Sequence, residues 1–329
     1  MRFLILGGTV FLGHAIAARA RDRHHHVTCA ARGSAPVPQG CDFVSMDRDD
    51  RDGLSPLTEH TWDVVVDVSR TPRHVMRAVR SLRGRHWVYV SSGNVYAHHD
   101  QREPAETAQL LPPVDDLDDP HDYDYGRAKV TCENLVRENA RSATVVRSGL
   151  IGGHGDWSAR SGYYPWRFAY PTGQDVLVPD APDFPVAMID VEDLADWIVQ
   201  AAENSLDGVF NATGPTITLA QFLHTSRVAA DSSAETRPVS RTDLARHGIT
   251  AWSGECSLPL WIDDPGWWWF ATLDTRAARA AGLVTRPLEH TLVAALAYED
   301  DRRRHGGGPG PLGAGLSDDD ERRLRSALT

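Results

Sequence analysis

Residues 2–13 read Arg-Phe-Leu-Ile-Leu-Gly-Gly-Thr-Val-Phe-Leu-Gly, and this stretch decides how the chain begins. The apolar run at 3–6 predicts a buried parallel strand, and the alanine-rich run after Gly13 predicts a helix to about residue 21. A strand, a glycine turn and a helix N-terminus together form a site for a dinucleotide pyrophosphate, because free amides and the helix dipole point at the anion.

The residue types within this turn suit that role, with one departure. Gly7 would allow the tight turn, and Gly13 would let the helix pack against the strand. Val10 occupies the place of the usual middle glycine, where its β-branched side chain could crowd the phosphates. The cofactor contacts predicted from the turn are Gly7, Gly8, Thr9, Phe11, Leu12 and Gly13.

The end of the second predicted strand, at about 26–31, indicates which dinucleotide binds. An acidic residue there holds the ribose hydroxyls of NAD, but this chain continues Arg32-Gly-Ser. A guanidinium matches a 2′-phosphate in charge and in geometry, so we expect NADP(H), with NAD(H) as the alternative. Asp47 is a candidate acceptor for the adenine amino group, and Ser69, after the strand at 62–68, is expected to line the cofactor.

A tyrosine and a lysine stand four residues apart at the start of a predicted helix, as Tyr125-Gly-Arg-Ala-Lys129. Residues at this spacing share one helix face, and an ammonium beside a phenol stabilises the phenolate that general acid–base catalysis needs. The strand 87–90 runs into Ser91 and Ser92, which places a serine hydroxyl before the pair along the chain. Ser92, Tyr125 and Lys129 are therefore the predicted catalytic residues.

With these motifs the chain resembles the extended and atypical short-chain dehydrogenase/reductases, the NAD-dependent epimerase/dehydratase family. The resemblance runs from the first strand to about residue 300 and includes Met-Ile-Asp-Val-Glu-Asp-Leu-Ala at 188–195. It implies that Tyr125 exchanges a proton with the substrate oxygen and that Ser92 holds that oxygen. It also implies that Lys129 bonds the nicotinamide ribose.

The segment after Arg147 is where the resemblance places substrate contacts, and it departs from the sugar-nucleotide enzymes. They usually read Arg-x-x-Asn-Val-Tyr-Gly-Pro there, whereas this chain has Leu150 in place of the asparagine that helps to hold the substrate diphosphate. The aromatic residues that follow favour a flat or hydrophobic substrate. The predicted substrate contacts are Asn94, Tyr96, Trp157, Tyr164, Trp166 and Arg167.

Three functions remain open at this point. The leading hypothesis is an NADP(H)-dependent oxidoreductase that reduces a carbonyl, or oxidises an alcohol, on a small aromatic or cyclic metabolite. The second is a sugar or nucleotide-sugar epimerase or dehydratase that retains NAD through oxidation and re-reduction. The third is a regulator that binds a dinucleotide without catalysis, although such a protein has no need of a Ser-Tyr-Lys set.

Composition narrows the partners to a small-molecule substrate. The chain has 329 residues and a net charge of −11, which disfavours nucleic acid, and no apolar stretch approaches a membrane span. Four cysteines without metal or disulfide spacing fit a cytoplasmic protein, and a homodimer is possible by analogy. We expect no metal site, since the histidines 24–26 and the acidic run 115–119 suit solvated loops.

Alternating strands and helices in the first half predict an α/β fold, a doubly wound parallel Rossmann sheet with a smaller C-terminal substrate lobe. Residues 1–151 are expected to form the dinucleotide-binding domain, with 187–215 returning to it. The substrate lobe is then 152–186 and 216–303. Gly-rich 304–316 is predicted to be a flexible linker before a terminal helix at 317–329, which Ser317 would cap.

Overall fold

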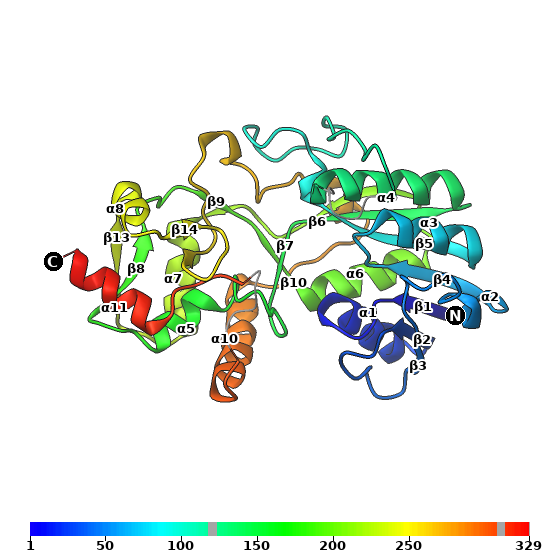
Figure 1. The fold of residues 1–329 in the computed structure, drawn as a ribbon, viewed down its shortest axis with the longest axis horizontal. Coiled ribbons are helices and arrows are strands. Elements are labelled where there is room, and N and C mark those ends of the chain that lie inside the picture. Colours follow the sequence, from blue (N-terminus) through cyan, green and yellow to red (C-terminus); the bar gives the residue numbers. More distant parts are fainter. Residues whose placement is uncertain (118–123, 308–312, 329) are drawn as a thin grey trace.

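The computed structural model describes residues 1–117, 124–307 and 313–328. A sheet lobe, built on a seven-stranded sheet, lies on the right of Figure 1, and a second lobe built on smaller sheets and helices lies on the left. The strands β7 (Leu150–Gly152) and β10 (Met188–Asp190) pair with each other between the two lobes (Figure 1).

The large sheet is parallel throughout, in the order β11-β6-β5-β4-β1-β2-β3. The strand order reverses between β1 and β4, and in such sheets ligands bind beyond the carboxyl ends of the strands at that point. The predicted doubly wound Rossmann fold is therefore confirmed. Its strands are β1 (Arg2–Leu6), β2 (His26–Ala31), β3 (Asp42–Ser45), β4 (Thr61–Asp67), β5 (Arg83–Ser92), β6 (Ala143–Ser148) and β11 (Gly208–Ala212).

Helices cover both faces of this sheet. The helix α1 (Phe11–Asp22) packs with α6 (Val191–Glu203), and α3 (Pro72–Ser81) packs with α4 (Tyr125–Asn139) on the other face (Figure 1). Successive strand residues point to opposite faces, so Ile5 joins the core under α1 and Leu4 joins the core under α3. The sheet lobe also holds α2 (Ser55–Thr58) and the short 3₁₀ turn η1 (Gly93–Val95).

The second lobe has its own hydrophobic core, in which Phe222 of α7 and Tyr163 of α5 are fully buried. Short strands pair around it as β8–β13, β9–β12 and β14–β15. The strands are β8 (Asp175–Pro179), β9 (Pro185–Val186), β12 (Ile217–Thr218), β13 (Glu235–Val239), β14 (Thr250–Ala251) and β15 (Ser257–Leu258). The helices are α5 (Tyr163–Ala169), α7 (Leu219–Ala229), α8 (Arg241–Arg246), η2 (Pro265–Trp267), α10 (Leu288–Arg304) and α11 (Asp318–Ala327).

Two segments lie elsewhere than the expected boundaries place them. The strand β10 pairs with β7 instead of joining the large sheet. The helix α9 (Arg276–Ala280), from the expected substrate lobe, contributes Ala278 to the core of the sheet lobe, and the carbonyl oxygen of Ala281 accepts a hydrogen bond from Trp197 Nε1 of α6 at 3.2 Å. This segment packs against β11 and is bound to α6, so it belongs to the sheet lobe.

The end of the chain returns to the second lobe. Residues 308–312 of the predicted linker lie outside the described residues, but 313–316 are buried because Leu316 packs into the core of that lobe. The flexible-linker prediction therefore does not hold for 313–316. Ser317 caps α11 by accepting a hydrogen bond from the Asp320 amide, as predicted. Across the parts of the chain that the structure describes, we find no helix long and apolar enough to cross a membrane.

Candidate active site

The glycine turn after β1 has the geometry that the sequence predicted for an anion site. Gly7 has a φ of +97°, which favours glycine, and its amide donates to the Ala30 carbonyl oxygen at 2.9 Å. A Cβ at Gly13 would collide with the Gly7 carbonyl oxygen, so α1 can approach the turn only with glycine at that position. The turn and the helix N-terminus are thus held together by backbone contact.

Val10 stands at the N-cap of α1 and is half-exposed. No side chain of the described residues caps this helix, so the amides of its first turn are available to an anion. Thr9 and Leu12 are buried beside it, and Phe11 has a φ of +39°. These observations fit a pyrophosphate at this turn, with the Val10 side chain directed to solvent.

The end of β2 presents a cation and no carboxylate. Arg32 follows the strand directly and is exposed, and no other described residue gives it a hydrogen bond or an ion pair. The next strand leads to Asp47, whose Oδ1 accepts from the Asp49 amide at 3.0 Å in a local turn. A contact of Arg32 with a ribose substituent therefore stays a prediction, and Asp47 is partly engaged by its own turn.

The ammonium of Lys129 is fixed by two carbonyl groups beside the carboxyl ends of β4 and β5. Its Nζ donates to the Val90 oxygen at 2.7 Å and to the Ser69 oxygen at 2.9 Å. The same Nζ lies 5.9 Å from the centre of the Tyr125 ring, one helical turn away. An ammonium has three donors, so one remains for a ligand. Ser69 thus contacts Lys129 through its backbone, and its contact with a cofactor stays a prediction.

Ser92 precedes η1 directly and Tyr125 begins α4, and these two elements pack against each other. The Ser92 hydroxyl donates to Asn94 Oδ1 at 2.9 Å, and the Asn94 amide donates back to Ser92 Oγ at 3.2 Å. Tyr125 is the first residue of α4 and is 41% exposed, so its phenol can reach a bound molecule. The phenol of Tyr125 thus lies near the fixed ammonium of Lys129, and Ser92 lies two residues beyond Val90, whose carbonyl oxygen that ammonium binds.

Gly126 is a site residue that the sequence analysis missed. A Cβ at this position would collide with the Asn94 carbonyl oxygen and would lie 2.5 Å from Leu111 Cδ1. Only glycine lets the first turn of α4 lie this close to η1, so Gly126 sets the position of Tyr125 relative to Ser92. The signal was present, since a glycine directly after the tyrosine is unfavourable inside a helix without such a reason.

A buried ion pair lies beneath the same strand ends. Arg147 Nη2 and Glu133 Oε2 are 2.7 Å apart, and both side chains are almost fully buried. The Ser91 hydroxyl donates to Glu133 Oε1 at 2.5 Å, so the serine beside Ser92 is bound to this pair. The fixed contact ties α4, β5 and β6 together below the catalytic residues.

A second buried pair fixes the turn that carries Ser69. Arg48 donates to both carboxylate oxygens of Asp67 at 2.8 Å, and Asp67 Oδ1 also accepts from the Ser69 amide at 2.9 Å. Burial opposes the charge on Asp67, but the attraction of Arg48 outweighs it, and the pKa of this carboxyl is lowered. Asp67 therefore stays ionised and holds the Ser69 backbone that anchors Lys129.

Four of the predicted substrate contacts are buried by their own neighbours. Tyr96 is 1% exposed and donates to Asn211 Oδ1 at 2.6 Å, inside the sheet lobe. Tyr164 is fully buried and donates to the Pro259 carbonyl oxygen at 3.3 Å. These two side chains have no surface left for a substrate. The prediction that Tyr96 and Tyr164 contact the substrate is therefore wrong.

The same correction applies to Trp166 and Arg167. The Trp166 ring lies between two guanidinium groups, with Arg303 at 3.6 Å and Arg167 at 4.7 Å from its centre. Arg167 itself is fully buried and pairs with Glu321 of α11 at 2.6 Å. Trp157 is 45% exposed and Asn94 borders Ser92, so these two remain candidate substrate contacts.

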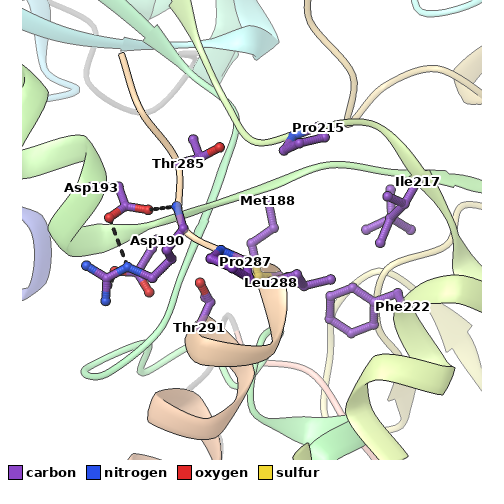
Figure 2. A pocket seen from close by; sticks show the side chains of 12 residues that line it. Met188, Asp190, Asp193, Pro215, Ile217, Phe222, Thr285, Pro287, Leu288 and Thr291 are labelled. Carbon is purple, nitrogen blue, oxygen red and sulfur yellow. Dashed lines mark hydrogen bonds and ion pairs between the residues drawn. The ribbon is translucent and has the colours of Figure 1, made fainter. Parts of the chain in front are cut away.

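A pocket of about 410 Å³ opens where the two lobes meet (Figure 2). Its wall includes Met188, which pairs in register with Leu150 of β7. Leu150 follows Ser148 by two residues, and Ser148 is the register partner of Ser92. A short run of chain thus connects the pocket wall to the catalytic strand ends. The lining is Val186, Met188, Asp190, Asp193, Pro215, Ile217, Phe222, Thr285, Arg286, Pro287, Leu288 and Thr291.

Of the acidic run 115–119, Asp118 and Asp119 lie outside the described residues. Within the described ranges, no cluster of three or more histidine, cysteine or acidic residues is arranged to hold a metal ion.

Comparison with known proteins gives a family model and a set of related folds. The model of the NAD dependent epimerase/dehydratase family matches residues 3–212. A search of curated proteins gives no match. Many solved structures share the fold, and two of those with bound NAD illustrate the likeness.

UDP-glucose 4-epimerase from Thermus thermophilus, solved with NAD, is 18% identical, with a TM-score of 0.65 over 91% of this chain and 98% of that chain. UDP-glucose-4-epimerase from Stenotrophomonas maltophila, solved with NAD and formylated UDP-arabinopyranose, is also 18% identical, with a TM-score of 0.66 over 93% of this chain and 99% of that chain. At this level of identity the likeness concerns the fold.

Proposed function

This chain belongs to the NAD dependent epimerase/dehydratase family, and on that premise we propose that it is an epimerase- or dehydratase-type enzyme acting on a hydroxyl-bearing ring. The observation that carries the proposal is Tyr125 held one helical turn from the anchored ammonium of Lys129, with Ser92 on the adjoining strand end. A bound nicotinamide dinucleotide would supply the hydride acceptor and donor.

Each residue of the site has a distinct proposed role. The turn 7–13 would bind the pyrophosphate through its amides. Lys129 would use its third donor on the ribose, and its two carbonyl contacts keep the ammonium from following a moving ligand. Ser92 would hold the reacting oxygen, exchanging its bond to Asn94 for one to the substrate. Tyr125 would take the hydroxyl proton on oxidation and return it on reduction.

An epimerase-type enzyme keeps its cofactor through the cycle, and this is the property to test. The purified protein is denatured and the released dinucleotide is identified and counted per chain. The holoprotein is then mixed with a panel of cyclic secondary alcohols, and the absorbance of reduced nicotinamide is followed. We expect at most one equivalent of reduced cofactor per chain, without any added dinucleotide.

Tyr125→Phe is the matched control for this experiment. The variant should retain the cofactor while its rate of nicotinamide reduction falls by about 10²–10⁴-fold, because only the proton-transfer group is lost. Cofactor reduction at the wild-type rate in Tyr125→Phe would exclude the proposed role of the phenol. A protein that holds no dinucleotide and turns over only with added NADPH would count against the epimerase function.

Two observations favour a second candidate, an NADP(H)-dependent carbonyl reductase. Arg32 is exposed at the end of β2, where a 2′-phosphate would lie, and Leu150 lacks the side-chain amide of sugar-nucleotide enzymes. Calorimetric titration with NADPH and NADH tests this candidate. Arg32→Ala should weaken NADPH binding by about tenfold or more and leave NADH unchanged, since only NADPH carries the charge that Arg32 meets. Equal losses of affinity for NADPH and NADH would mean that Arg32 does not support the NADP(H)-dependent candidate.

A further inference from the structure

The pocket between the lobes has an apolar wall that begins at Met188 of the strand β10. Val186, Met188 and Phe222 are buried side chains at its base, and Ile217 and Leu288 are half-buried at its sides. Figure 2 shows Met188, Ile217 and Phe222 around one common space, with the start of α10 closing it from below. Its volume of about 410 Å³ falls in the range of small-molecule sites.

The charged residues of this pocket are already paired with one another. Arg286 Nε lies 2.9 Å from Asp193 Oδ1, and the Arg286 amide donates to Asp193 Oδ2 at 2.7 Å (Figure 2). The same guanidinium lies 3.2 Å from Glu192 Oε2 and 3.5 Å from Asp190 Oδ1. Of these carboxylates, Asp190 and Asp193 line the pocket together with Arg286, whereas Glu192 lies outside the lining and also faces Arg19 at 3.6 Å. Two carboxylates and one cation leave this side of the pocket with a surplus of negative charge.

This charge balance selects against an anionic ligand. A diphosphate placed here would meet the carboxylates of Asp190 and Asp193 and a guanidinium that is already paired with carboxylates, and like charges brought together in a partly desolvated site oppose binding. An uncharged apolar group meets no such cost and buries the apolar wall. The half-buried Leu150, paired with Met188, extends the same apolar surface towards the catalytic strand ends.

We propose that this pocket binds the part of the substrate remote from the reacting carbon, and that this part is an uncharged, mainly apolar group in place of a nucleoside diphosphate. The inference rests on the proposed function for the reacting end of the substrate. The substrate is then a ring alcohol or ketone with an apolar substituent. The reacting oxygen lies at Tyr125 and Ser92, and the substituent lies against Met188, Ile217 and Phe222.

Two probes separate the possibilities, 4-phenylcyclohexanone as the uncharged apolar ligand and UDP-glucose as the diphosphate. Each is titrated calorimetrically into the cofactor-loaded protein. The ketone should bind at least about tenfold more tightly than UDP-glucose, because only the diphosphate meets the surplus of carboxylates. Failure of the ketone to bind, or tighter binding of UDP-glucose, would overturn the inference.

The variant Ile217→Arg places a charge on the apolar wall and should weaken ketone binding by about tenfold or more. Val284→Arg is the matched control, because Val284 is 77% exposed on the same segment as Arg286 but is not a pocket residue, and its ketone affinity should be unchanged. Where Ile217→Arg does not fold, Leu288→Gln tests the same wall. Unaltered ketone affinity in a folded pocket variant would overturn the inference.

The failure of the inference and that of the proposed function give different results. Tyr125→Phe should lose turnover but keep most of its ketone affinity, because it removes only the contact of the phenol with the reacting oxygen and leaves the pocket wall unaltered. Ketone binding that Ile217→Arg weakens, without turnover by the wild type, would reject the catalytic proposal and leave the pocket assignment standing. Turnover of UDP-glucose with tighter binding than the ketone would support the catalytic proposal and reject the pocket assignment.

Discussion

Each lobe buries one arginine almost completely, but the two arginines have partners of different kinds. In the sheet lobe, the Arg147 side chain is 2% exposed and pairs with Glu133 of α4, a helix in the middle of the chain. Arg167 of the second lobe is fully buried and pairs with Glu321 and Asp318 of α11, the terminal helix. A buried charge therefore stabilises the floor of the active site in one lobe and fastens the end of the chain in the other.

The difference lies in what can move when a partner is removed. Glu133 is held by α4, which also carries Tyr125 and Lys129, so it has no route to solvent that leaves the site intact. Glu321 is held by α11, and we expect this helix to separate from the lobe and rehydrate its carboxylates when Arg167 is removed. Breaking the Arg147–Glu133 pair should therefore affect stability and the site differently from breaking the Arg167–Glu321 pair.

The largest effect is expected from Arg147→Met. The variant leaves the Glu133 carboxylate buried without its cation, which costs about 3–5 kcal/mol in unfolding free energy. Urea denaturation measures this loss. Arg85→Met is the matched control, because the Arg85–Asp63 pair is exposed and should contribute less than about 1 kcal/mol. Equal losses of unfolding free energy in the two variants would show that burial does not increase the contribution of the ion pair to stability.

A smaller loss is expected from Arg167→Met, about 1–3 kcal/mol, because α11 can detach and return Glu321 to water. Limited proteolysis mapped by mass spectrometry should show faster cleavage after residue 312, with cofactor content unchanged. A loss as large as that of Arg147→Met, without faster cleavage, would mean that α11 cannot separate from the lobe.

The sequence predicted the sheet lobe better than the second lobe, for a physical reason. A dinucleotide turn constrains backbone geometry residue by residue, so Gly7 and Gly13 identify it locally, and the Tyr125–Lys129 spacing is fixed by one helical turn. Arg167 and Trp166 carry no such local signal. Whether an arginine next to a tryptophan faces a cleft or a core depends on where α10 and α11 pack, and these helices lie more than 100 residues further along the chain.

The substrate pocket shows the same limit. Leu150 in place of an asparagine was visible as a departure from the sugar-nucleotide pattern. The apolar wall, however, combines Ile217 and Phe222 with Leu288, which comes from a distant part of the chain. Gly126 was visible as well, and only the close approach of Asn94 explains it. Residues that act through tertiary contacts needed the structure, whereas residues that act through local geometry did not.

The N-cap of α11 tests how firmly the terminal helix is attached. The Ser317 hydroxyl accepts from the Asp320 amide at 3.1 Å, and loss of such a cap costs about 1 kcal/mol. Ser317→Ala should lower the unfolding free energy by that amount. Ser317→Thr should restore most of it, because a threonine hydroxyl can accept from the Asp320 amide and donate to the Asp320 carboxylate as serine does. Identical denaturation curves for Ser317→Ala and the wild type would indicate that α11 adds nothing to global unfolding.

The smallest predicted effect is a pH dependence of stability that arises in the sheet lobe, at His86. His86 of β5 is buried between Ser142 and Thr144, with ring nitrogens 2.9 Å from both hydroxyl oxygens. Burial lowers its pKa below 6.5, although the nearby Asp207 acts in the opposite direction. The folded state thus binds this proton less readily than the unfolded chain, so the stabilisation is complete above pH 6.5 and declines as the pH falls below it.

The decline should amount to about 1 kcal/mol or less between pH 6.5 and pH 5.5, measured by urea denaturation at each pH. His86→Asn keeps a donor and an acceptor between the two hydroxyls and should show a shallower decline. His247→Asn, at an exposed histidine of the second lobe, should follow the wild type. If His86→Asn loses as much stability on acidification as the wild type, the acid sensitivity of the sheet lobe lies elsewhere. If it loses less, the interior of the sheet lobe is sensitive to acid in a pH range where the paired arginines of both lobes keep their charge.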